Sequence, residues 1–292
     1  MEYSDYPLHA WSRYRRRMQE SCPRKAMLFY RDARAGADPM AEPELRRLHE
    51  CRNRITLDEY IFRLLHDFVR QAFYDFTEEG TLRYPSTDAL KCAMQARFDR
   101  EFERMIYGDS SRDHKLCFLR ELEDKNCRIT ALMERAAGQI SHVCAALEHD
   151  LWRLITSTPG ISRRNIASPL EVYINDLCCY CAPVIALESS GSFWIVEFNG
   201  DDTTALLHKF YGINTLGREP EQLRSFAYDV NSGSFSEIGL TLPVSEQLKR
   251  ISADGAAWEE LLALPTEEIS GNAAHCNECQ FCRLCPKKGE VK

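Results

Sequence analysis

Apolar residues recur at helical spacing through the first half of the chain. In residues 60–73, the side chains of Phe62, Leu65, Val69 and Phe73 fall on one face of a helix. Residues 101–107, 116–135 and 139–154 have a similar amphipathic pattern, whereas residues 84–87 and 108–111 are rich in turn formers. We therefore expect a helical region over residues 41–157 that is broken at these two turns.

The pattern changes in character after residue 160. Short β-favouring apolar runs cover residues 169–174, 184–188, 193–198, 222–229 and 235–240. Turn formers at 189–191 predict a hairpin between the second and third runs, and turn formers at 231–233 separate the last two. Helical patterns cover 203–212 and 245–262. This order of strands and helices predicts a mixed α/β fold.

The composition narrows the class of protein. The chain has 292 residues, a net charge of −7 and 44% hydrophobic residues, which is typical of a globular protein and excludes global disorder. No run of 18 apolar residues predicts a membrane span, and residues 1–18 lack the apolar run of a secretory signal. We expect a cytoplasmic protein with no membrane partner. The net acidity favours protein partners and still permits a local basic groove.

The 13 cysteines are the most unusual feature of the composition. An odd number of thiols in a reducing compartment argues against a disulfide framework and favours metal binding. Four of them, Cys276, Cys279, Cys282 and Cys285, recur every three residues near the C-terminus. Thiols at this spacing on a turn can converge on zinc or on an iron–sulfur cluster. Cys22, 254 residues before Cys276, is a candidate for a further ligand.

The N-terminal motif Cys22-Pro23-Arg24-Lys25 resembles the opening motif of the RecB-type iron–sulfur nucleases, which include the AddB subunit and the CRISPR adaptation nucleases. The spacing of Cys276, Cys279 and Cys285 is similar to the closing motif of that family. The resemblance implies that Cys22, Cys276, Cys279 and Cys285 hold a 4Fe-4S cluster. Cys282 would then be spare or a substitute for the last ligand, and zinc is the alternative metal.

The same family has a PD-(D/E)xK core, which is a restriction-endonuclease-like mixed sheet flanked by helices. The hairpin expected at 182–200, the helix that follows it and the next two strands have the matching order. The resemblance implies four segments: an N-terminal segment at 1–40, a helical region at 41–157, the α/β core at 158–270 and a cluster-binding tail at 271–292.

The catalytic positions of that family are altered in this chain. Its Asp, Lys and Gln positions correspond to Val184, Asn199 and Leu207, while its second carboxylate and its Tyr correspond to Glu197 and Tyr211. His66 matches the family's N-terminal His and could equally be a buried structural residue. Nucleases of this kind need carboxylates to hold Mg²⁺ or Mn²⁺. We therefore expect a degenerate nuclease. An active nuclease would need a replacement carboxylate, for which the candidates are Asp176, Glu188, Asp201 and Asp202.

Binding partners follow from the same reasoning. We expect DNA, either single-stranded or at a duplex end, together with protein partners in a complex. The basic residues expected to contact phosphates are Arg13, Arg15, Arg16, Arg17, Arg24 and Lys25. A zinc-stapled protein-interaction module without a role in nucleic-acid binding is the alternative.

Three further cysteines, Cys178, Cys179 and Cys181, lie close together in a β-favouring stretch. Alternation along a strand would send Cys179 and Cys181 to one face, where they are expected to pack in the core.

Overall fold

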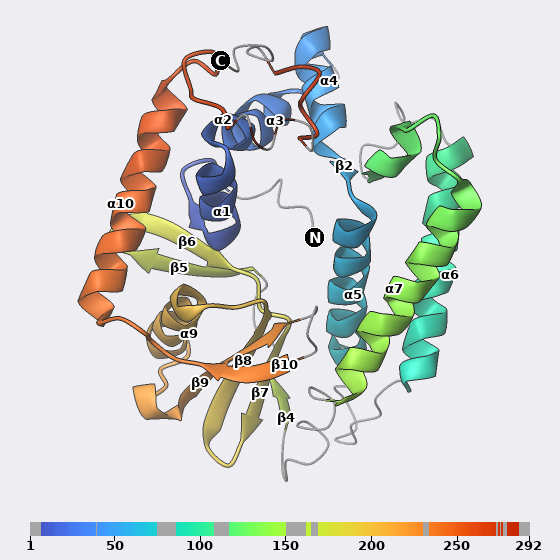
Figure 1. The fold of residues 1–292 in the computed structure, drawn as a ribbon. Coiled ribbons are helices and arrows are strands. Elements are labelled where there is room, and N and C mark those ends of the chain that lie inside the picture. Colours follow the sequence, from blue (N-terminus) through green and yellow to red (C-terminus); the bar gives the residue numbers. More distant parts are fainter. Residues whose placement is uncertain are drawn as a thin grey trace. The chain divides into compact units, whose positions relative to one another are not determined.

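The computed structural model describes residues 7–38, 40–74, 86–107, 117–149, 162–164, 169–229, 234–272, 274, 276 and 279–285. The chain forms two compact units (Figure 1). The first unit contains residues 1–60, 101–127 and 250–292, and the second contains residues 61–100 and 128–249. Neither unit is one continuous stretch of sequence. The segment boundaries expected at residues 40, 157 and 270 therefore remain predictions about sequence segments and not about compact units.

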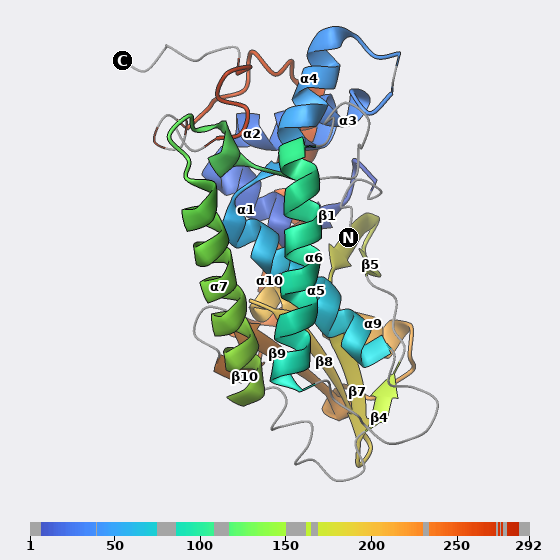
Figure 2. The same ribbon diagram turned by 90° about the vertical axis from the view of Figure 1, so that its right-hand side faces the viewer.

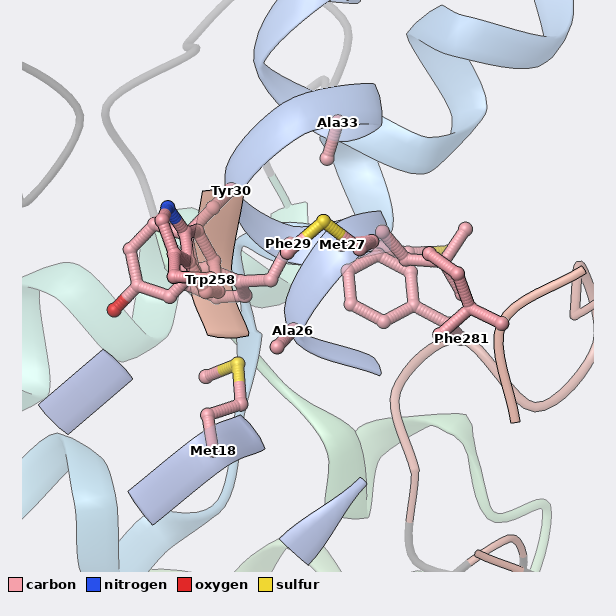
Figure 3. Close-up of a cluster of buried hydrophobic side chains, with 11 residues drawn as sticks. Met18, Ala26, Met27, Phe29, Tyr30, Ala33, Trp258 and Phe281 are labelled. Carbon is pink, nitrogen blue, oxygen red and sulfur yellow. The ribbon is translucent and has the colours of Figure 1, made fainter. Parts of the chain in front are cut away.

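Several short helices from the N-terminal segment belong to the first unit. They are α1 (Arg13–Ser21), α2 (Pro23–Met27), a π-helical turn (Leu28–Asp32), α3 (Ala33–Ala35) and α4 (Pro43–Arg52). Strand β1 (Trp11–Ser12) precedes α1, whose N-cap is Ser12. Strands β2 (Arg54–Ile55) and β3 (Phe118–Leu119) pair in parallel. The hydrophobic core of this unit joins residues of the N-terminal helices to Trp258, Ile269 and Phe281 from the C-terminal segment (Figure 3).

Three long helices carry the amphipathic patterns of the first half of the chain. They are α5 (Leu57–Tyr74), α6 (Thr87–Tyr107) and α7 (Ile129–His149). The lower parts of α6 and α7 lie side by side (Figures 1 and 2), and the Cys144 thiol contacts the Met94 sulfur at 3.6 Å. Of the break expected at 84–87, residues 84 and 85 lie outside the described residues, and Ser86 caps α6 by accepting from the Ala89 amide. The turn expected at 108–111 lies outside the described residues.

The expectation of a single amphipathic stretch over 116–135 was wrong. The described part of this segment holds β3, a 3-10 turn (Arg120–Glu123) and only the first residues of α7. Asp124 explains the interruption, because its carboxylate accepts from the Asn126 amide and its carbonyl accepts from the Cys127 amide. A side chain that closes a local turn in this way competes with the helical hydrogen-bond ladder.

A five-stranded mixed sheet forms the centre of the second unit, with strand order β10-β9-β8-β7-β4. Strands β4 (Ser162–Arg164), β7 (Ile185–Ser189) and β8 (Ser192–Phe198) are antiparallel neighbours. Helix α9 (Asp202–Asn214) connects β8 to the parallel strand β9 (Leu223–Asp229) after a 3-10 turn (Pro220–Gln222), and β10 (Ser234–Ile238) pairs antiparallel with β9. Helix α10 (Val244–Ala263) follows, and its residues from 250 onward belong to the first unit. The predicted mixed α/β class is therefore confirmed.

The turns of this unit use left-handed backbone conformations. Ser190 and Gly191 have φ values of 49° and 80°, which closes the predicted β7–β8 hairpin with two residues between paired Ser189 and Ser192. A second hairpin joins β5 (Leu170–Ile174) to β6 (Leu177–Cys181) through Asn175, whose φ is 52°. In β6 the alternation is as predicted, because Cys179 and Cys181 are buried and Cys178 is half-buried.

Candidate metal sites

The Cys22 motif is the junction between two helices of the first unit. Cys22 has an extended backbone, with φ −161°, and it ends α1 and caps α2. Pro23 occupies the first turn of α2, where a missing amide hydrogen costs nothing. The Cys22 sulfur accepts from the Lys25 amide at 3.4 Å. The motif therefore fixes the direction of one buried thiol.

The C-terminal segment is hydrogen-bonded to this junction. The Asn272 amide donates to the Cys22 sulfur at 3.4 Å, and the Asn272 side chain donates to the Ser21 carbonyl at 3.0 Å. The buried guanidinium of Arg24, 5% exposed, donates twice to the Ile269 carbonyl at 2.8 and 2.6 Å. Residues 269–272 are thus hydrogen-bonded to residues 21–24. A metal site shared by Cys22 and the C-terminal cysteines requires these two segments to lie together.

The cysteine-rich loop is folded into successive tight turns. The Cys279 amide donates to the Cys276 carbonyl at 3.2 Å, the Cys282 amide to the Cys279 carbonyl at 3.0 Å, and the Cys285 amide to the Phe281 carbonyl at 2.9 Å. Phe281 is fully buried and contacts Phe29 edge to face at 6.5 Å between ring centroids. The Cys285 sulfur accepts from the Arg24 guanidinium at 3.6 Å. One buried ring therefore anchors the loop that carries the thiols.

Electrostatic interactions distinguish Cys282 from the other thiols of the loop. Burial raises the pKa of Cys279, Lys25 lowers it, and the thiols of Cys22 and Cys285 raise it. Burial also raises the pKa of Cys51, to which Cys282 adds a smaller upward effect. The thiols that act on the pKa of Cys279 are therefore those of Cys22 and Cys285, and the thiol of Cys282 acts on the pKa of Cys51. The choice of Cys285 over Cys282 as the last ligand remains a prediction.

The spacing of these thiols bears on the kind of metal they fit. A tetrahedral zinc ion with bonds of about 2.3 Å brings its sulfur ligands to about 3.8 Å from one another. Within the described residues, no three of Cys22, Cys276, Cys279, Cys282 and Cys285 have sulfur atoms within 4.8 Å of one another. The donor set, which is thiolate alone, fits both zinc and iron–sulfur chemistry. Within the described part of the chain, the thiols are not drawn together as tightly as a tetrahedral zinc site would hold them.

Three of the residues that match the nuclease motif, Val184, Glu197 and Asn199, lie at one end of the β7–β8 hairpin. Val184 precedes β7, is buried, and donates its amide to the Val196 carbonyl at 2.8 Å. Glu197, 7% exposed, lies near the end of β8, and Asn199 follows with a φ of 52°. The His66 ring from α5 packs against Phe198 at 5.7 Å between centroids. Leu207 and Tyr211 are buried in α9.

Glu197 has two further neighbours that the sequence pattern did not reveal. The ligand atoms of Cys181, Glu197 and His208 all lie within 4.8 Å of one another, and all three side chains are buried. The His208 Nε2 atom is 3.4 Å from the Glu197 Oε2 atom. Cys181 was expected to be a packing residue and His208 was not singled out. This group is a candidate metal-binding triad, and we refer to it below as the core triad.

The replacement carboxylates have other partners. Glu188 pairs with Arg218 at 3.0 Å, and Asp201 caps α9 by accepting from the Thr204 amide at 3.0 Å. Asp202 accepts from the Thr241 hydroxyl, and Asp176 is exposed in the β5–β6 turn. Within the described residues, none of these four carboxylates joins Glu197 in a group of three ligand atoms within 4.8 Å, and a rearranged Mg²⁺ site remains a prediction.

The structure corrects part of the predicted phosphate-binding set. Arg15, 4% exposed, lies over the rings of Tyr30 and Trp258 and donates to the Leu8 and Ala10 carbonyls. Arg24 is bound to the Ile269 carbonyl as described above. Burial of these two guanidinium groups argues against contact with phosphate. Arg16 pairs with Glu20 at 2.8 Å and with Asp254 at 3.5 Å. Contacts by Arg13, Arg17 and Lys25, which are exposed or half-buried, remain predictions.

Comparisons with known proteins add little to this picture. No family model matches the sequence, and no curated protein matches it. One solved structure, described as the crystal structure of SSO0001, is similar over 77% of this chain and 95% of that chain, with 14% identity and a TM-score of 0.27. A likeness of this size carries no argument about fold or function.

Within the described residues, no helix is both long and apolar enough to cross a membrane.

Proposed function

We propose that this protein is an iron–sulfur member of the PD-(D/E)xK nuclease superfamily that binds DNA without cutting it. It would act as a DNA-binding or scaffolding subunit of a nucleic-acid-processing or defence complex. The observation that carries the proposal is the junction between Cys22 and the C-terminal cysteine loop. Hydrogen bonds from Asn272 and Arg24 hold together two motifs that are more than 240 residues apart.

The thiols support an iron–sulfur cluster as the resident group. Cys22, Cys276, Cys279 and Cys285 would hold it, and the four thiolates would supply its iron ligands. Hydrogen bonds to the sulfur atoms of Cys22 and Cys285 bring the two segments that carry these thiols together. A link between residues so far apart in sequence removes chain entropy from the unfolded state, so the role we infer for the cluster is structural.

The sheet of the second unit supports a nuclease-like core. The antiparallel strands β7 and β8, the connecting helix α9 and the parallel strand β9 occur in the order that the family resemblance implies. Glu197 lies on β8, and Pro183 lies two residues before the neighbouring strand β7, in the order in which that family has its second and first motifs. The order of elements and these two residues support the superfamily assignment.

Two replacements argue against metal-dependent hydrolysis. Mg²⁺ requires oxygen ligands, and Val184 offers none at the Asp position. Asn199 at the Lys position carries no positive charge to place beside the reacting phosphate. Its left-handed backbone conformation is one that Asn adopts more readily than Lys does. The backbone conformation at residue 199 therefore favours the Asn that is present over the Lys of the nuclease motif.

A substitution at residue 199 tests this match. We expect Asn199→Lys to lower the free energy of unfolding by about 1 kcal/mol, because a long side chain at positive φ is strained. Asn199→Gly should change it by less than about 0.5 kcal/mol, since glycine adopts this conformation freely. Asn214→Lys at the end of α9 makes the same exchange without positive φ and is the control. Urea unfolding of the three variants provides the comparison, and an Asn199→Lys protein as stable as the control would contradict the argument.

A single experiment tests both halves of the proposed function. Anaerobically purified protein is incubated with labelled single-stranded DNA in Mg²⁺ or Mn²⁺, and both binding and cleavage are followed. We expect binding that weakens with salt and no cleavage. Replacing Arg13 and Arg17 by alanine should lower the slope of log K against log salt by about 1.4, because each lost phosphate contact removes about 0.7. Lys125→Ala, an exposed charge outside α1, is the control.

Two outcomes would count against the proposal. Cleavage that disappears in Glu197→Gln would show that the altered core still hydrolyses DNA. Absence of salt-dependent DNA binding, together with bound zinc in place of iron, would instead support a zinc-stapled protein-interaction module.

A further inference from the structure

The core triad draws one residue from each of three neighbouring elements of the second unit. Cys181 is the last residue of β6, Glu197 is near the end of β8, and His208 lies in the middle of α9. All three are buried, and their ligand atoms lie within 4.8 Å of one another. A thiol, a carboxylate and an imidazole thus converge at one point inside the unit.

His208 is the residue that requires an explanation. It is 1% exposed, and neither ring nitrogen makes a hydrogen bond within the described part of the chain. Buried polar groups in native proteins are nearly always bonded, and leaving one without a partner is costly. The imidazole instead directs Nε2 toward Glu197, at a distance of 3.4 Å.

This distance is the one that a shared metal ion would impose. In a tetrahedral zinc site, with bonds of about 2.1 Å to nitrogen and oxygen, two such ligand atoms lie about 3.4 Å apart. A direct hydrogen bond would be shorter, with a usual range of about 2.7–3.2 Å. The separation between His208 and Glu197 therefore matches two ligands of one ion better than a hydrogen-bonded pair.

The donor set selects the class of metal. Mg²⁺ and Ca²⁺ take oxygen ligands, and only one of the three residues supplies oxygen. A combination of thiolate, imidazole and carboxylate is typical of zinc, which has intermediate softness. Three protein ligands leave a fourth position, which water occupies in zinc sites of this type.

We infer that Cys181, Glu197 and His208 bind a zinc ion in the core of the second unit. The ion ties the β5–β6 hairpin to β8 and α9. The carboxylate that the nuclease resemblance assigns to a catalytic metal serves a buried zinc site instead. This inference rests only on residues of the second unit and does not depend on the terminal cysteine cluster.

Metal analysis of matched variants tests the inference. Wild type, Cys181→Ser, His208→Gln and Cys178→Ser are purified in the same way, and zinc per chain is measured by mass spectrometry. Cys178 is the control because it lies in the same strand but its side chain is outside the triad. We expect wild type and Cys178→Ser to carry about one more zinc per chain than the two triad variants. Equal zinc content in all four proteins overturns the inference.

A second measurement covers the case in which a triad variant folds poorly. Wild type and Cys178→Ser are stripped with a chelator, and the melting temperature is followed as Zn²⁺ or Mg²⁺ is added. We expect Zn²⁺ to raise the melting temperature of both proteins and Mg²⁺ to leave it unchanged. Cobalt added in place of zinc should give a thiolate-to-metal absorption band in Cys178→Ser. In His208→Gln the intensity of that band should be lower by the amount that one cobalt ion per chain contributes.

These readouts separate the two metal sites. In protein that retains its iron, the terminal thiols are occupied, so any zinc response reports on the second unit. No stabilisation of wild type by Zn²⁺, or the same stabilisation in folded His208→Gln as in Cys178→Ser, overturns the inference. Loss of iron with retention of zinc would contradict the proposed cluster and leave the core triad supported.

Discussion

Replacing Cys285 by serine is expected to abolish binding of the iron–sulfur cluster. Cys285 lies at the end of the loop, its sulfur accepts from Arg24, and it interacts electrostatically with Cys279. A hydroxyl is a far weaker ligand for iron than a thiolate, so a cluster with three thiolates should be labile. Iron and acid-labile sulfide, measured after anaerobic purification, should fall from about four of each per chain toward zero.

Cys282→Ser is the matched control for this prediction. It removes a thiol from the same loop, three residues away, and that thiol is the one expected not to be a cluster ligand. We expect Cys282→Ser to keep its iron and its visible absorbance. If Cys282→Ser loses iron and Cys285→Ser does not, the ligand assignment is reversed. If wild type holds zinc at the terminal thiols and no iron, the cluster proposal fails.

Replacing Phe281 by alanine is expected to cause the largest loss of stability. The ring is fully buried in the core of the first unit, where it lies against Met27 and Phe29 (Figure 3). Removing a buried phenyl ring leaves a cavity and costs about 3–5 kcal/mol. Denaturant unfolding of iron-free protein measures this effect apart from the cluster.

The same substitution should also weaken the cysteine loop. The Phe281 carbonyl accepts from the Cys285 amide, and the residue lies between Cys279 and Cys282. We therefore expect Phe281→Ala to hold less iron than wild type. Tyr14→Ala, which removes an exposed ring from α1 of the same unit, should change the free energy of unfolding by less than about 0.5 kcal/mol. Equal effects of the two substitutions would show that Phe281 does not anchor the loop.

The strands and the main helices could be predicted from the sequence because their signals are local. The β7–β8 hairpin has apolar runs on both sides of Ser190 and Gly191, whose backbone conformations fit the turn. The 116–135 segment was misread because the amphipathic pattern continues through a turn that Asp124 closes. A periodic pattern carries no information about a side chain that caps its own backbone.

The sites were predictable only in part. Cys22 and the C-terminal cysteines have a recognisable spacing, and hydrogen bonds do join their two segments. Cys181, Glu197 and His208 lie on three elements without a shared spacing, so only the folded sheet and helix bring them together. Arg15 and Arg24 belong to a basic run, and sequence cannot show that their guanidinium groups are buried.

The division of the chain into two units has a consequence for the order of folding during synthesis. The second unit is complete once residue 249 has been made, whereas the first unit needs residues up to the C-terminal loop. Its core places Met18 and Met27 with Trp258 and Phe281, so its N-terminal helices must wait for residues 258–281. Pairings this distant in sequence form slowly. On the ribosome, the newly made N-terminal segment therefore carries exposed apolar surface until residues 258–281 have emerged, which makes it the natural point for chaperone contact.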